Sequence, residues 1–126
     1  MKRNESQENY LERIYFLKKR KGFVRSVDIA RALQVTKPSV SVAMKQLREG
    51  GLITMDEHNL IDLTAEGLVI AKRMAERHEH IAQLLMRLGV EEEVAYDDAC
   101  RVEHDISEQT FEALKKLSKE GLGPQA

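Results

Sequence analysis

The hydrophobic and polar residues of this chain alternate in two different patterns, and each pattern predicts a different kind of secondary-structure element. In the first fifty residues, apolar positions recur every three or four residues, the spacing that gathers them on one face of an α-helix. This spacing predicts three helices, over residues 5–21, 25–33 and 37–49. Two short apolar runs follow at 52–55 and 60–63, and the polar turn between them predicts a β-hairpin.

Helical spacing returns after the hairpin and continues to about residue 119. Thr64 is the predicted N-cap of a long helix that reaches about Leu88, and Gly89 ends it. A fifth helix is predicted over 91–104, and a sixth opens at Ser107 and ends near residue 119, before a frayed tail over 121–126. The candidate core positions of the long helix are Ile70, Met74, Ile81, Leu84, Leu85 and Leu88.

The first three helices and the hairpin occur in the order of a winged helix, with a tight turn at 34–35 between the second and third helices. Ser26 and Thr36 are the predicted N-caps of these two helices, and Pro38 is tolerated in the first turn of the third. The third helix would then enter the major groove of DNA. The residues expected to contact DNA are Arg25, Ser26, Thr36, Lys37, Pro38, Ser39, Ser41 and Lys45.

Two observations weigh on this DNA-binding interpretation. Ser39 and Ser41 are also what a solvated face of an amphipathic helix would carry. The tip of the hairpin, at 56–58, is acidic, whereas wings that hold phosphate are usually basic. The wing therefore contributes little to binding, or contributes through its backbone amides.

Composition narrows the class of protein. The 126 residues make one domain or two very small ones, and a hydrophobic content of 42% is enough for a packed core. The aromatic content of 5% argues against a stacking platform for single-stranded nucleic acid. Cys100 is the single cysteine, which excludes an internal disulfide and fits a reducing compartment. With no long apolar run and no signal peptide, we expect a soluble, cytoplasmic protein without a membrane partner.

The net charge of −1 conceals two oppositely charged halves. Residues 1–50 hold twelve Lys and Arg against five Asp and Glu, a net charge of +7. Residues 51–126 hold eight against sixteen, a net charge of −8. A basic half is the electrostatic feature of a nucleic-acid-binding module, and an acidic half suits cations. A solvated charged surface would also account for either half.

The motif Cys100-x-x-Glu103-His104 carries the candidate chemistry of the second half. Positions i, i+3 and i+4 share one face of a helix, so one turn could direct a thiolate, a carboxylate and an imidazole at one point. These ligands suit a divalent metal such as Fe²⁺, Zn²⁺, Co²⁺ or Mn²⁺. The alternative is a half-buried cysteine beside surface charges.

Several segments together resemble the metal-dependent repressors of the diphtheria toxin repressor and manganese transport regulator type. The segments that carry the resemblance are ENYLERIY at 8–15, VRSVDIA at 24–30, KPSV at 37–40, LTAEG at 63–67, RHE at 77–79 and ACRVEHDIS at 99–107. The resemblance covers about residues 6–118. It implies a homodimer that binds operator DNA when loaded with Fe²⁺ or Mn²⁺, and that represses genes for metal uptake.

The resemblance also implies a set of metal ligands. By position these are Asn9, Glu12, His78, Cys100, Glu103 and His104. Asn9 departs from the family, which has Met there in its iron branch and Asp in its manganese branch. Cys100 follows the iron branch, where the manganese branch has Glu.

The iron branch of the family has a second metal site, and we expect this chain to lack part of it. Ala82 and Tyr96 stand where that branch has Glu and His, so its second site is incomplete. Glu12 and His78 could complete a second site of the manganese kind. We interpret His58 and His80 as surface residues.

We therefore expect a mainly α protein, with a winged helix-turn-helix DNA-binding domain over 1–64 and a helical dimerisation and metal-binding domain over 65–126. The first helix would also contribute to the metal site. The leading hypothesis is a cytoplasmic, homodimeric repressor of metal homeostasis that binds double-stranded operator DNA with Fe²⁺ or Mn²⁺, for which Co²⁺, Ni²⁺ or Zn²⁺ could substitute in vitro.

Two alternatives for Cys100 stay open at this point. It could act as a thiol redox switch, with His104 as its activating neighbour. It could also form a nucleophile–base pair with His104 in an enzyme. The chain has neither a glycine-rich loop for an oxyanion nor an H-E-x-x-H motif, so we expect no enzyme.

Overall fold

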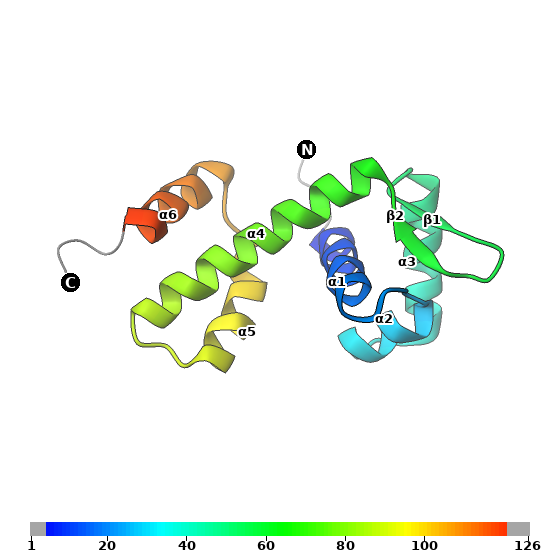
Figure 1. Ribbon diagram of the computed structural model, residues 1–126, viewed down its shortest axis with the longest axis horizontal. Coiled ribbons are helices and arrows are strands. Elements are labelled where there is room, and N and C mark those ends of the chain that lie inside the picture. The colour runs from blue at the N-terminus through cyan, green and yellow to red at the C-terminus, as the bar shows by residue number, and fades with distance from the viewer. Residues whose placement is uncertain (1–4, 121–126) are drawn as a thin grey trace. The chain divides into compact units, whose positions relative to one another are not determined.

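The computed structural model describes residues 5–120, and within this range the chain is mainly α-helical (Figure 1). The order of the elements is α1 (Glu5–Lys21), α2 (Ser26–Leu33), α3 (Lys37–Glu49), β1 (Ile53–Met55), β2 (Ile61–Leu63), α4 (Ala65–Arg87), α5 (Glu92–Val102) and α6 (Glu108–Glu120). The predicted fold class is confirmed. The frayed tail predicted for 121–126 lies outside the described residues.

The chain divides into two compact units, one ending at Arg73 and the other beginning at Met74. The long helix α4 contributes residues to both units. The domain boundary predicted after residue 64 coincides with the start of α4 and stays a prediction.

The first unit contains the helix-turn-helix. Its apolar core is formed by side chains of α1, α2, α3, the hairpin and the start of α4, among which Leu11, Ile14 and Val40 are fully buried. The α2 helix begins at Ser26, one residue after its predicted start. The prediction that Ser26 is its N-cap is wrong, because Ser26 is the first helical residue. Arg25 holds that position, because its backbone N–H donates to the Asp28 carboxylate over 3.0 Å.

The turn between α2 and α3 agrees with the prediction. Gln34 adopts the left-handed conformation with φ of 56°, which ends α2 and turns the chain. Thr36 is the N-cap of α3, since its hydroxyl accepts the backbone N–H of Ser39 over 3.2 Å. Pro38 lies in the first turn, where a missing N–H costs nothing. The α3 helix is thereby fixed at its start.

The hairpin packs onto the beginning of α4. Its strands pair antiparallel, with Ile53 opposite Leu63, and each begins one residue later than predicted. Thr64 caps α4 as predicted, accepting the backbone N–H of Gly67 over 3.1 Å. A Cβ on Gly67 would lie 2.0 Å from the carbonyl oxygen of Leu52. Glycine is therefore required where α4 meets the chain before β1.

The second unit is built from the rest of α4 with α5 and α6. Its small core joins Ile81 and Ala82 of α4 to Ala99 of α5. Most of the core positions predicted for α4 are confirmed, but Leu88 is 62% exposed. That prediction is wrong because α4 ends at Arg87 and Gly89, with φ of 100°, turns the chain away. Within residues 5–120, none of the helices has the length and apolar character needed to cross a membrane.

The fifth helix is shorter than predicted, and the difference concerns the candidate ligands. It ends at Val102, so Glu103 is its C-cap and His104 lies in the turn that follows. The backbone N–H of Asp105 bonds to the carbonyl of Val102 over 3.0 Å, which tightens this turn. One regular turn of helix therefore does not present the motif.

Candidate metal centre and nucleic-acid interface

Three candidate ligands of the second unit converge on one point. His78 comes from the middle of α4, Cys100 from the last turn of α5, and Glu103 from its C-cap. One donor atom from each lies within 4.8 Å of the other two. The carboxylate of Glu103 is completely buried, while His78 and Cys100 are partly exposed. The structure thus brings together residues separated by twenty-five positions in sequence.

His104 approaches the same carboxylate from another side. Its Nε2 lies 3.3 Å from one oxygen of Glu103, and Nδ1 of His78 lies 3.5 Å from the other. The side chain of His104 is 2% exposed. Glu103 is therefore contacted by two imidazoles, one at each oxygen.

The donor set fits a divalent metal. Taking a carboxylate out of water costs several kcal/mol unless a positive charge or strong hydrogen bonds compensate it. Ligands about 2.0–2.3 Å from a tetrahedral metal lie roughly 3.3–3.8 Å from one another, and the His78–Glu103 separation of 3.5 Å falls in that range. Sulfur, imidazole nitrogen and carboxylate oxygen together favour borderline metals over Mg²⁺ or Ca²⁺.

Ala82 and Tyr96 stand at the positions where the iron branch has the Glu and His ligands of its second metal site, and neither supplies such a ligand here. Ala82 is fully buried in the core with Ala99. The Tyr96 hydroxyl donates to the Glu79 carboxylate over 3.0 Å, and its ring lies 5.4 Å from that of His78. Burial and the neighbouring Glu79 carboxylate raise the pKa of Tyr96. Tyr96 therefore stays protonated at neutral pH, and its ring lies beside the imidazole.

The remaining predicted ligands belong to the first unit. Asn9 and Glu12 both lie on α1, Asn9 half-buried and Glu12 almost completely buried. Their role as ligands stays a prediction. His80 is half-buried, with its ring 6.1 Å from that of Phe111, rather than on the surface as we expected.

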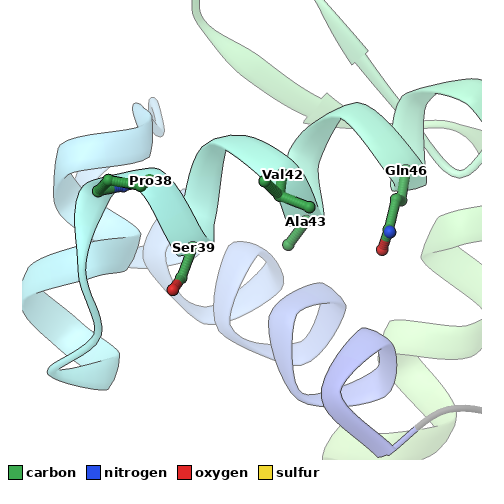
Figure 2. Close-up of a pocket in the computed structure, with 5 residues that line it drawn as sticks. All are labelled: Pro38, Ser39, Val42, Ala43 and Gln46. Atoms are coloured by element: carbon green, nitrogen blue, oxygen red, sulfur yellow. The ribbon is translucent and has the colours of Figure 1, made fainter.

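The outer face of α3 carries most of the residues predicted to contact DNA. The exposed residues on or next to this helix include Thr36, Lys37, Pro38, Ser39, Ser41 and Lys45. Figure 2 shows that Ser39, Val42 and Gln46 also project along this helix, beside Pro38 and Ala43, and together they line a shallow concavity. Val42 is 58% exposed.

Sequence reasoning missed Val42 and Gln46. Their spacing from Ser39, by three and seven residues, places them on the same helical face and could have identified them. The DNA contacts were predicted mainly from charged and hydroxyl side chains, and a valine and a glutamine on the same face were therefore left out. A valine methyl can contact the methyl of thymine, and a glutamine amide can pair with adenine.

The N-terminus of α2 supplies the other two predicted DNA contacts. Arg25 is exposed, and its guanidinium lies 5.5 Å from the ring centroid of Phe23. Ser26 is half-buried in the first turn of α2.

The acidic tip of the wing has a structural role. The Asp56 carboxylate accepts the backbone N–H groups of His58 and Leu60 over 2.8 and 2.9 Å. The bond from Leu60 is the main cause of the lowered pKa of Asp56. This carboxylate closes the turn, which explains an acid at the tip without any contact with DNA.

Comparison with protein families assigns both halves of the chain. Residues 3–59 match the N-terminal DNA-binding domain of iron-dependent repressors. Residues 64–120 match the metal-binding and dimerisation domain of the same repressors.

Individual relatives agree with these matches. The HTH-type transcriptional regulator MntR of Lysinibacillus sphaericus is 35% identical over 112 residues, covering 89% of this chain and 81% of that protein. The transcriptional regulator MntR of Escherichia coli O157:H7 is 38% identical over 117 residues, covering 93% and 76%.

Solved structures show the same fold. The manganese regulator SloR superposes with a TM-score of 0.79 at 29% identity, over 96% of this chain and 56% of that one. IdeR of T. acidophilum gives 0.78 at 28% identity, over 86% and 52%. This chain thus spans little more than half of these two solved chains. These relatives are regulators and not enzymes, and with the two domain matches they show that this chain belongs to the iron-dependent repressor family of metal-dependent, DNA-binding transcriptional repressors.

Proposed function

We propose that this chain represses genes of metal homeostasis by binding double-stranded operator DNA when Fe²⁺ or Mn²⁺ is bound at the cluster around Glu103. The observation that supports this most is the buried Glu103 carboxylate, which two imidazoles contact and near which the Cys100 sulfur lies, within 4.8 Å. The proposed ligands are His78, Cys100, Glu103 and His104, with Glu12 and Asn9 as further ligands from α1.

A divalent metal would supply the positive charge that a buried carboxylate and a thiolate require. Glu103 provides the negative charge, and its two oxygens reach towards two different imidazoles. Cys100 supplies a soft donor from α5, and His78 joins α4 to it. Within the second unit these side chains fasten two helices to one another.

The outer face of α3 is the proposed operator-reading surface. Lys37 and Lys45 would contact phosphates, and Ser39 and Gln46 would reach base edges. As a homodimer, the repressor would place two such helices in major grooves about one DNA turn apart. Metal favours DNA binding to the extent that it binds the DNA-competent state more tightly. We also propose that the protein works in the cytoplasm, and that the DNA-binding domain ends at residue 64.

The direct test is DNA affinity measured by fluorescence anisotropy, first with Mn²⁺ and then with EDTA. The operator would be a duplex selected from random sequence by the Mn²⁺-loaded protein. We expect tight binding with Mn²⁺ and loss of the sequence-specific component with EDTA. Equal affinity under both conditions would disprove metal dependence, although the chain would remain a DNA-binding protein.

Metal preference is tested by Cys100→Glu. A thiolate favours Fe²⁺, Co²⁺ and Zn²⁺, whereas a carboxylate suits Mn²⁺. The ratio of Mn²⁺ to Co²⁺ affinity, measured by calorimetry under reducing conditions, should therefore rise in the variant. An unchanged ratio would remove the Cys100 side chain from the ligands.

The comparisons give no support to the redox-switch alternative for Cys100.

A further inference from the structure

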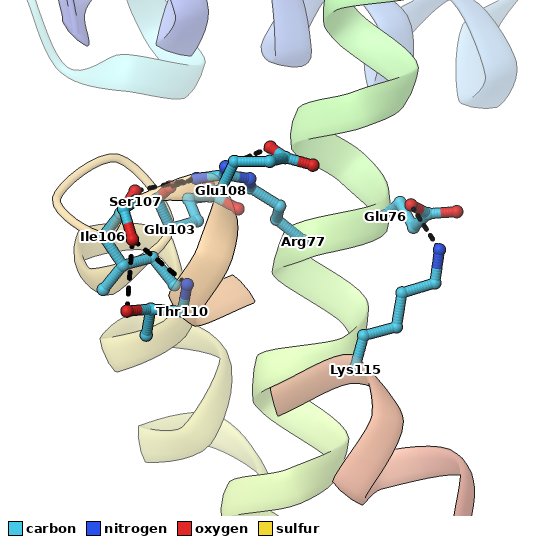
Figure 3. Close-up of polar contacts among 8 residues, drawn as sticks. All are labelled: Glu76, Arg77, Glu103, Ile106, Ser107, Glu108, Thr110 and Lys115. Carbon is cyan, nitrogen blue, oxygen red and sulfur yellow. Dashed lines mark hydrogen bonds and ion pairs between the residues drawn. The ribbon is translucent and has the colours of Figure 1, made fainter. Parts of the chain in front are cut away.

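Arg77 is a buried cation whose contacts converge on the segment that carries Glu103 and His104. It lies on α4, immediately before His78, and is 7% exposed. Its Nη1 donates to the carbonyl of Glu103 over 2.8 Å and to the carbonyl of Ile106 over 3.2 Å. Its Nη2 donates to the Glu108 carboxylate over 2.8 Å. Figure 3 shows this guanidinium between α4 and the turn that precedes α6.

The bond to the carbonyl of Glu103 has a specific geometric effect. That carbonyl belongs to the planar peptide group that joins Glu103 to His104. Holding its oxygen fixes the plane from which both side chains extend. The bond to Ile106 holds the far end of the same turn, where no regular helix orders the backbone.

The surroundings of Arg77 keep its guanidinium in place. Its Cζ lies 5.0 Å from the ring centroid of Phe111, and Glu108 neutralises its charge at the start of α6. A planar fork can serve several acceptors in fixed directions, which a lysine ammonium cannot do. This arrangement is more specific than a general tie between helices. Lys115 and Glu76 already form such a tie between α6 and α4, over 3.3 Å and away from the turn.

We propose that Arg77 is a positioning residue of the metal centre, which holds the Glu103–His104 peptide so that both side chains address one ion. This inference rests on the proposed function of the cluster. Because Arg77 and His78 are neighbours on α4, one helix would supply a ligand and also the support for two others.

The test compares Arg77→Met, Arg77→Lys and the control Lys115→Met with the unsubstituted protein. Methionine keeps much of the packing and removes every donor, whereas lysine keeps the charge without the fork. Lys115→Met breaks a separate cationic link between α4 and α6 and leaves the turn untouched. Co²⁺ affinity is measured by titration, the visible spectrum of bound Co²⁺ reports ligand geometry, and circular dichroism in EDTA reports folding without metal.

We expect Arg77→Met to fold in EDTA and to bind Co²⁺ about 10–100-fold more weakly, with an altered spectrum. Arg77→Lys should recover stability more than affinity, and its spectrum should stay altered. Lys115→Met should match the unsubstituted protein in affinity and spectrum. If Arg77→Met does not fold, Arg77→Lys decides by the same readouts.

Other results would overturn the positioning role. Unchanged affinity and spectrum in the folded Arg77 variants would do so, as would an equal loss in Lys115→Met. Failure of both Arg77 variants to fold in EDTA would make Arg77 a structural residue instead. If the unsubstituted protein bound no Co²⁺, the proposed metal centre itself would fall, and that result is distinct from the others.

Discussion

Ser39, Val42 and Gln46 on the outer face of α3 are open to solvent, whereas Glu103 and His104 in the second unit are almost completely buried. The exposed face is produced by one regular helix, and its residues need no help from other elements to project outward. The buried cluster draws on two helices and a turn. A contact made in water contributes little on its own, while a buried charge without its partners is costly. Single substitutions should therefore have larger effects at the cluster.

The strongest test of this difference is His104→Ala. Removing one imidazole beside the buried Glu103 carboxylate should lower metal affinity by about 10–100-fold, by analogy with losses of supporting residues in other metal sites. DNA binding in EDTA should not change. Calorimetry with Mn²⁺ and anisotropy with operator DNA provide the two measurements.

His80→Ala is the matched control for this substitution. His80 also lies in the second unit, but its ring contacts Phe111 instead of Glu103. Its loss should leave metal affinity unchanged. Unaltered affinity in His104→Ala, or an equal loss in His80→Ala, would mean that His104 is not a ligand.

A smaller effect is expected on the exposed face. Lys45→Ala removes one proposed phosphate contact, so affinity should fall about fivefold near 0.15 M salt for every DNA sequence, and the salt slope should decrease by about one. Lys72→Ala, which removes an exposed lysine from α4, is the control. A loss restricted to one base pair, with the slope unchanged, would show that Lys45 reads sequence instead.

An effect of similar size in free energy concerns the scaffold that supports the exposed face. The Lys21 ammonium donates to the Asp28 carboxylate over 2.7 Å, and this bond is the main cause of the lowered pKa of Asp28. A lowered carboxyl pKa stabilises the fold at neutral pH, and the benefit is lost as the pH falls through that pKa. Asp28→Asn should therefore cost about 1 kcal/mol at pH 7, since the lysine is partly exposed.

Urea unfolding of the protein and of Asp28→Asn at several pH values checks this expectation. The difference in unfolding free energy should shrink steadily below pH 4 and should not depend on added metal. A difference that stayed constant down to pH 2 would show that the carboxylate charge contributes nothing. Loss of the difference with Mn²⁺ would contradict the separation of scaffold and metal centre.

Local patterns predicted the regular elements well and their tertiary roles less well. The bounds of α1, the cap at Thr36 and the hairpin follow from apolar spacing and turn chemistry, which act between neighbours in sequence. The convergence of His78 on Cys100 and Glu103 came from the family resemblance, because spacing within α4 says nothing about α5. Ser26 and Leu88 were misplaced by one residue at helix ends, where the boundary is defined only to within one or two residues.

Arg77 could not have been identified from sequence at all. The partners through which it holds the turn are two backbone carbonyls, and a carbonyl has no residue type that a pattern could detect. The first two residues of this turn, Glu103 and His104, were predicted as helix because helical spacing continues through His104, whereas α5 ends at Val102.

The end of α5 at Val102 has a consequence for the lifetime of the closed cluster. Segments outside regular helices open with less free energy than the helices that flank them. The 103–106 turn can therefore open while α5 stays intact, so backbone amides there should exchange with solvent sooner than those at the centre of α5. A ligand that binds only the closed turn suppresses this opening in proportion to its concentration over its dissociation constant. Metal concentration would then set the fraction of time that Glu103 and His104 spend in the closed turn.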